Sequence, residues 1–129
     1  MGDPVVELAR RVRDQAYAPY SGFPVGAAIE SVDGRLFAGA NVENASYGLT
    51  LCAERVALAA AVSAGARRFA RIVVATGGSP PAAPCGACRQ ALAEFGSSIR
   101  VEAVGPDATR SWLLSELLPD EFGPADLPE

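Results

Sequence analysis

The three cysteines are the residues whose type and spacing best suit chemistry. Cys85 and Cys88 stand at i and i+3, on one face of a helix's first turn, after Pro84 fixes the entry of the chain. Zinc prefers thiolate and imidazole, and because the chain contains no histidine, Cys52 is the only remaining soft ligand. A structural zinc site normally has a fourth Cys or His, whereas a catalytic site leaves that position for water. The pattern favours one catalytic Zn²⁺ per chain, held by Cys52, Cys85 and Cys88.

Two charged residues follow Cys52 closely. Without histidine, proton transfer falls to a carboxylate, and Glu54 is near enough to reach the open position of the metal from a helix's first turn. We predict that Glu54 takes a proton from the attacking water and returns it to the substrate. Three thiolates on Zn²⁺ leave surplus negative charge, which opposes ionisation of that water. Arg55 and the N-termini of the two predicted helices are placed to offset this charge.

Each of these features also has a simpler interpretation. A lone Cys-x-x-Cys is more often half of a structural zinc site or a redox pair. Cys52 alone would be a small core residue, and Glu54 alone would be a solvated or capping residue of a helix. A non-catalytic module whose thiolates only hold the fold together is therefore the alternative from a different functional class.

Helices and strands alternate along the chain in a way that places these motifs. Pro4 follows an N-cap Asp3, and apolar residues then recur on one helical face as far as Ala16. Residues 33–34, Asp-Gly, form a strong hairpin signal. The other predicted elements are strands over 24–30 and 35–40, a helix over 52–64, a strand over 71–76, a loop over 77–84, a helix over 85–95, a strand over 99–104 and a helix over 112–118.

This order of elements predicts the fold class. A hairpin followed by helix, strand, helix and strand implies a mixed sheet whose later strands are parallel, with helices on both faces. A length of 129 residues is close to the commonest domain size. We therefore expect residues 1–129 to form one α/β domain with three α/β/α layers.

Composition disfavours several classes of partner. The formal net charge is -4, and the longest basic runs are the pairs Arg10–Arg11 and Arg67–Arg68, which argues against a nucleic-acid backbone as partner. No apolar stretch reaches the ~20 residues of a membrane span, and the N-terminus lacks the apolar core of a secretory signal. An odd number of cysteines does not suit a disulfide framework. We expect a soluble cytoplasmic protein without a membrane partner.

Several motifs together resemble one known family, the small homotetrameric zinc-dependent cytidine deaminases. The similar segments are residues 16–28, 41–48, 52–55, 84–90 and 116–119. The resemblance implies a mixed five-stranded sheet, a homotetramer, and hydrolytic conversion of free cytidine and deoxycytidine to uridine and deoxyuridine, with release of ammonia, in pyrimidine salvage. A zinc ion held by cysteine beside a non-ligand glutamate is the general design of such deaminases.

The resemblance also implies roles for particular residues. Asn41 and Glu43 would bind the ribose hydroxyls, Phe23 would pack against the nucleoside, and Glu54 would protonate N3 of the ring. From the residues alone, Asn41 and Glu43 are as typical of a turn between a strand and a helix. Phe122 would reach the pocket of a neighbouring subunit; packing of Phe122 on its own subunit is the equal alternative.

Two related enzymes remain as alternatives within the same fold. One deaminates an aminoacyl cytosine antibiotic such as blasticidin S, and the other acts on cytosine within nucleic acid. The segment 41–44, Asn-Val-Glu-Asn, favours a free nucleoside over both. Nucleic-acid editors usually have His-x-Glu where this chain has Cys52-Ala53-Glu54, and they have a more basic surface.

Overall fold

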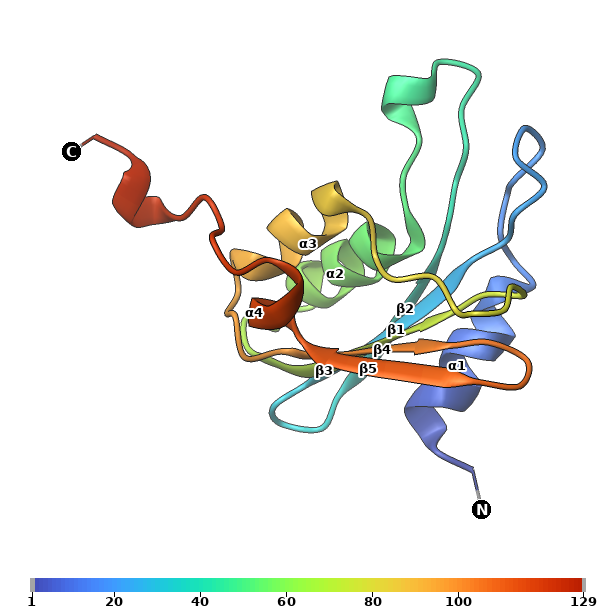
Figure 1. The fold of residues 1–129 in the computed structure, drawn as a ribbon, viewed down its shortest axis with the longest axis horizontal. Coiled ribbons are helices and arrows are strands. Elements are labelled where there is room, and N and C mark those ends of the chain that lie inside the picture. Colours follow the sequence, from blue (N-terminus) through green and yellow to red (C-terminus); the bar gives the residue numbers. More distant parts are fainter. Residues whose placement is uncertain (1, 129) are drawn as a thin grey trace.

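A five-stranded mixed sheet forms the centre of the protein (Figure 1). The structure is a computed structural model and describes residues 2–128. The strands are β1 (Gly26–Ser31), β2 (Leu36–Ala40), β3 (Phe69–Ala75), β4 (Arg100–Val104) and β5 (Thr109–Leu113). Their order across the sheet is β2-β1-β3-β4-β5. The pair β3–β4 is parallel, as predicted for the later strands, and the other neighbouring pairs are antiparallel.

Helices cover both faces of this sheet and complete three layers. The helices are α1 (Pro4–Arg13), α2 (Ala53–Ser63), α3 (Gly86–Ala93) and α4 (Leu114–Leu117), with short 3-10 turns at η1 (Tyr47–Leu49) and η2 (Pro124–Asp126). Helix α1 packs on one face, where Val5 and Ala9 contact the cluster that contains Val73 and Ala75. Helices α2, α3 and α4 pack on the other face (Figure 1). The predicted α/β/α arrangement with a five-stranded mixed sheet is confirmed.

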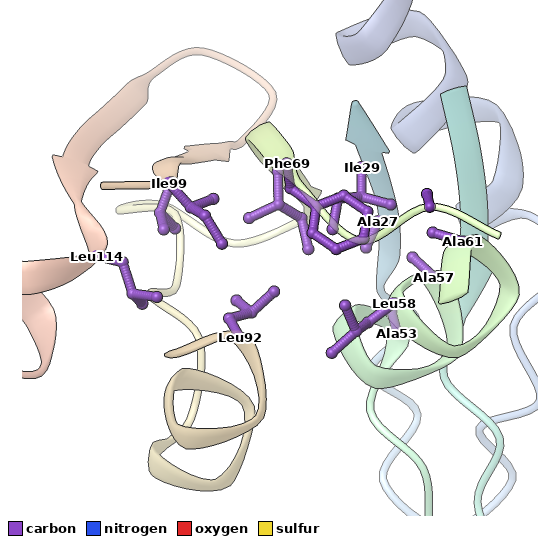
Figure 2. Close-up of a cluster of buried hydrophobic side chains, with 13 residues drawn as sticks. Ala27, Ile29, Ala53, Ala57, Leu58, Ala61, Phe69, Leu92, Ile99 and Leu114 are labelled. Carbon is purple, nitrogen blue, oxygen red and sulfur yellow. The ribbon is translucent and has the colours of Figure 1, made fainter. Parts of the chain in front are cut away.

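The larger part of the core lies between the sheet and the helices α2 and α3 (Figure 2). Side chains alternate between the two faces of a strand, so Ile72 of β3 points to these helices while Val73 points to α1. Leu58 of α2 and Leu92 of α3 meet Ile72 in this cluster. The two helices whose N-cap residues are Cys52 and Cys85 are thereby fixed against the same face of one sheet.

Small residues let α2 approach the sheet very closely. A Cβ atom at Gly39 of β2 would lie 2.5 Å from the backbone nitrogen of Ala57, which leaves no room for a side chain. Val56 also lies against Gly39, but Ala53, Ala57 and Ala61 of α2 are all small and completely buried. The position of the first turn of α2 is therefore set by backbone contact with β2, without intervening long side chains.

Two predicted elements differ from those observed. The first helix ends at Arg13 and does not continue through Ala16, because the chain beyond it pairs with the segment after β2. Tyr17 donates its N–H to the Asn41 carbonyl, and its own carbonyl accepts from the N–H of Glu43. Tertiary pairing here outweighs the helical pattern.

The prediction of a helix over 112–118 was also wrong at its start. Residues Thr109–Leu113 form the edge strand β5, and the helix begins only at Leu114. Trp112 pairs with Val101 of β4, and the backbone of β4 would otherwise lack partners on that side. The remaining predicted helices and strands are present, each with bounds within two residues of those predicted.

Within residues 2–128, no helix combines the length and the apolar character that crossing a bilayer would require.

Candidate active site

Two helix N-termini bring the three thiols together. Cys52 is the N-cap residue of α2, Cys85 is the N-cap residue of α3, and Cys88 lies in the first turn of α3. The Sγ atom of Cys85 is 3.8 Å from that of Cys52 and 3.4 Å from that of Cys88, and all three lie within 4.8 Å of one another. Unpaired backbone N–H groups and the positive helix ends favour negative charge at this point.

The thiol geometry fits a tetrahedral zinc ion. Zinc–sulfur bonds of ~2.3 Å at tetrahedral angles place sulfur atoms roughly 3.8 Å apart, close to the spacing observed. Burial raises the pKa of Cys52 and of Cys88. Burial also acts to raise the pKa of Cys85, but hydrogen bonds, led by one from the Cys88 backbone N–H, lower it overall. A cation is therefore needed to hold all three sulfurs as thiolates, and the cluster is placed to bind one.

Glu54 lies beside the thiols in a nearly dry environment. Its side chain belongs to the first turn of α2, the residue is only 5% exposed, and it lines the same cavity as Cys52 and Cys85. Burial raises the pKa of the Glu54 carboxyl above its ordinary value, although the charge of Arg55 acts in the opposite direction. A carboxyl whose pKa is raised toward neutrality is suited to accept and release protons.

Arg55 reaches back toward the cluster from the next position on α2. Its Nη2 atom lies 3.8 Å from Cys52 Sγ and donates a hydrogen bond of 3.3 Å to the Thr50 carbonyl. The carbonyl contact fixes the guanidinium beside the sulfur. The expected contact between Arg55 and a metal-ligating sulfur is therefore present, and it supplies positive charge to an anionic group of ligands.

A cavity of about 280 Å³ opens beside the thiols and collects the predicted binding residues. Phe23, Asn41 and Glu43, which come from the segments before β1 and after β2, line it together with Glu54, Cys52 and Cys85. The volume and the mixture of apolar walls with a few polar groups are typical of a small-molecule site.

Asn41 and Glu43 hold the loop that carries Phe23. The Asn41 side chain accepts from the Val25 N–H at 2.9 Å and donates to the Phe23 carbonyl at 3.0 Å. The Glu43 carboxylate accepts from the backbone N–H groups of Tyr20 and Ser21, at 2.9 and 3.0 Å.

Ser21 is a residue of this site that the sequence reasoning missed. Its hydroxyl donates to the Glu43 carboxylate, and this bond, the first of the causes, lowers the pKa of Glu43. Ser21 also lines the cavity. Its signals were its place in the family-like segment 16–28 and its position beside Gly22, and neither reveals a partner more than twenty residues away.

Comparison with known proteins decides the family. Residues 3–103 match the model of the cytidine and deoxycytidylate deaminase zinc-binding region. The chain belongs to the cytidine deaminase family. Its members are zinc-dependent hydrolases, and the resemblance noted in the motifs is confirmed.

Individual cytidine deaminases resemble this chain over most of its length. A cytidine deaminase of Halalkalibacterium halodurans is 44% identical over 125 residues, covering 95% of both chains. A cytidine deaminase of Mycobacterium tuberculosis is 48% identical over 113 residues, which covers 88% of this chain and 83% of the relative. The crystal structure of a cytidine deaminase from Burkholderia pseudomallei has a TM-score of 0.89 at 47% identity, covering 95% of this chain and 100% of that one.

Phe122 lies apart from the other predicted site residues of this chain. Its side chain is 58% exposed and does not line the cavity of its own chain. The Gln90 side chain of α3 holds its backbone, donating to the Phe122 carbonyl at 2.6 Å and accepting from its N–H at 3.2 Å. The tail is thus anchored while the aromatic ring faces outward.

Proposed function

We propose that the protein hydrolyses free cytidine and deoxycytidine to uridine and deoxyuridine, with release of ammonia. The observation that carries the proposal is that Glu54, Cys52 and Cys85 line one cavity of nucleoside size, and that Cys88 completes the group of thiols beside it. Zinc held by Cys52, Cys85 and Cys88 supplies Lewis acidity that makes water a nucleophile near neutral pH.

Glu54 performs the proton transfers in this proposal. Its carboxylate takes a proton from the attacking water and delivers it to N3 of the pyrimidine as the new C4–O bond forms. It then carries the second proton to the amino group, so that the C4–N bond breaks and ammonia leaves. Burial supports this role, because it raises the pKa of Glu54 and so makes its carboxylate a stronger proton acceptor than an exposed one.

Asn41 and Glu43 recognise the sugar in this proposal. Their side chains line the cavity and, although they already hold the Phe23 loop, each keeps spare hydrogen-bonding capacity. Phe23 packs against the nucleoside. A free base would forgo the hydrogen bonds that the remaining donors and acceptors of these side chains offer to the sugar, which disfavours free cytosine. Turnover of cytosine, blasticidin S and single-stranded DNA should accordingly be far slower than turnover of cytidine.

We propose that residues 1–129 form a single domain and that the protein works as a homotetramer in the cytoplasm. Large apolar side chains stand exposed on the arm formed by residues 17–23 and 42–51 and on the tail. They are Tyr17, Tyr20, Phe23, Val42, Tyr47, Leu49, Leu51, Phe122 and Leu127. Contact with other subunits would bury them and bring Phe122 to a neighbouring cavity. Light scattering coupled to size-exclusion chromatography measures the oligomeric state, and we expect the mass of four chains.

Substitution of Glu54 by Gln tests the reaction. The variant should keep about one zinc per chain while deamination of cytidine, followed by its absorbance, falls by a factor of a thousand or more. A matched control, Glu7→Gln on the exposed face of α1, should retain full activity. If Glu54→Gln kept most of its activity, Glu54 would not be the residue that transfers the protons. Absence of activity in the zinc-loaded unmodified protein would support the non-catalytic module.

A further inference from the structure

One buried hydroxyl in the cavity has no partner. Among residues 2–128, Thr76 Oγ1 and Arg55 Nε are the buried side-chain polar atoms without a hydrogen bond. Arg55 Nε belongs to a guanidinium that is otherwise bonded, whereas the hydroxyl is the only polar group of the Thr76 side chain. Thr76 is 2% exposed, yet it is one of the residues that line the cavity. Its hydroxyl is thus withheld from bulk water on a side chain that forms part of the cavity wall.

The sheet holds Thr76 firmly in this position. Thr76 directly follows β3, and its N–H donates to the Val104 carbonyl of β4 at 3.0 Å. It lies two residues beyond Val74, so both side chains point to the face that carries α2 and α3, and both line the cavity. The sheet therefore keeps the Thr76 side chain on the face that borders the cavity.

The surroundings of Thr76 indicate which part of a nucleoside it would meet. Ser21, Glu43 and Thr50 line both the inner cavity and a second, outer depression on the arm, so they mark the mouth. Thr76 lines only the inner cavity, as Glu54 and Asn41 do, and strand β1 separates the end of β3, where Thr76 lies, from the end of β2, where Asn41 lies. The reacting base must reach the inner end, while the sugar lies toward the mouth with Glu43.

This inference rests on the function proposed above, the deamination of cytidine. We propose that Thr76 is a further substrate-binding residue whose hydroxyl hydrogen-bonds the pyrimidine ring of the bound nucleoside. An unpaired buried hydroxyl costs free energy in the empty protein, and a ligand that pairs it recovers that cost. The hydroxyl therefore lowers the stability of the empty protein and raises affinity for the base.

Replacing Thr76 by Val, which has nearly the same shape, separates these two effects. The zinc-loaded variant should bind uridine about three- to tenfold more weakly by calorimetry, since one neutral hydrogen bond is lost. The KM for cytidine and for deoxycytidine should rise by that same factor, with kcat little changed. Without nucleoside, its Tm should rise by about 3 °C, because the unpaired group is gone.

Two further variants complete the test. Thr76→Ser keeps the hydroxyl and should bind uridine like the unmodified protein, and Thr109→Val, which removes an exposed hydroxyl from β5, should change neither affinity nor KM. Should Thr76→Val not fold, Thr76→Ala provides the affinity measurement.

Specific results would overturn the inference. Unchanged affinity for uridine would show that the hydroxyl is not used, and a lowered Tm in Thr76→Val would show that it is already paired, through a buried water, in the empty protein. A KM change confined to cytidine would place the contact at the 2′-hydroxyl. Turnover of cytidine by the unmodified protein is measured first, so that failure of the proposed function is distinguished from failure of the Thr76 contact.

Discussion

Arg55 and Cys52 face each other across the first turn of α2, with Nη2 of the arginine 3.8 Å from Sγ of the cysteine. The hydrogen bond to this sulfur is the first cause of a raised pKa for Arg55, so the guanidinium stays charged. A sulfur ligand that shares its charge with a cation donates less charge to the metal. The arrangement therefore links one side chain outside the group of ligands to the acidity of water in the site.

Substitution of Arg55 by Gln should slow the enzyme without removing zinc. We expect one zinc per chain and a kcat reduced by about ten- to a hundredfold. Loss of the positive charge disfavours ionisation of the attacking water, so the pH at which activity rises should shift upward. Arg55→Lys should show a smaller effect, and Arg100→Gln on the exposed side of β4 should show none. An unmoved pH profile with unchanged rate would refute charge compensation.

Removal of zinc should destabilise the protein and make rebinding dependent on pH. Burial raises the pKa of Cys52 and Cys88, so the metal-free thiols carry protons that zinc must displace. Zinc affinity should therefore fall as the pH falls. Calorimetric titration of the chelator-treated protein at pH 7, in two buffers of different ionisation enthalpy, should show release of more than one proton per zinc. Binding without proton release would contradict the raised pKa values.

The metal cluster was predictable from sequence because few residues were eligible to form it. With no histidine and only three cysteines, the ligands could be chosen by elimination. The i, i+3 spacing of Cys85 and Cys88 then fixed two of them on one helical turn. Local patterns of this kind survive folding because one helix positions both groups.

Features that depend on distant pairing could not be predicted in the same way. The strand Thr109–Leu113 has only one partly buried residue, Trp112, so no alternation marked it as an edge strand. Thr76 gave no signal either, since a threonine at the end of a strand is ordinary. The Thr76 hydroxyl is unpaired because the end of β3 forms part of the cavity wall, and this position becomes known only once the strands are assembled into the sheet.

An ion pair between α1 and the sheet should contribute to stability in a pH-dependent way. Arg71 of β3 contacts Asp3 at 2.5 Å and Glu102 at 2.6 Å. The hydrogen bond from Arg71 lowers the pKa of Asp3 below its ordinary value of 3.8. A carboxyl whose pKa is lower in the folded state stabilises the fold above its unfolded pKa, and this contribution disappears as the pH falls through its folded pKa.

Asp3→Asn tests this contribution while keeping the N-cap, since Asn caps helices as well as Asp. Because Asp3 is 40% exposed, the expected loss in the free energy of unfolding at pH 7 is only about 0.2–1 kcal/mol. Denaturation by urea should show this difference at pH 7, and the two proteins should converge below the folded pKa of Asp3. Asp107→Asn, in an exposed turn, serves as the control. A difference that persists in acid would point to lost capping instead.

Gly39 links packing of the sheet to the chemistry of the site. In Gly39→Ala the new Cβ would lie 2.5 Å from the Ala57 nitrogen, so α2 must move away from β2. Such overpacking costs about 1–3 kcal/mol of unfolding free energy. Because α2 carries Glu54 in its first turn, kcat should also fall, by up to about a hundredfold for a shift near 1 Å. Gly48→Ala, where no atom lies within 4 Å of the new Cβ, should preserve both quantities. If Gly39→Ala were inactive but as stable as the unmodified protein, α2 would move without the expected loss of unfolding free energy. If the variant were both stable and fully active, α2 and β2 would be farther apart than described.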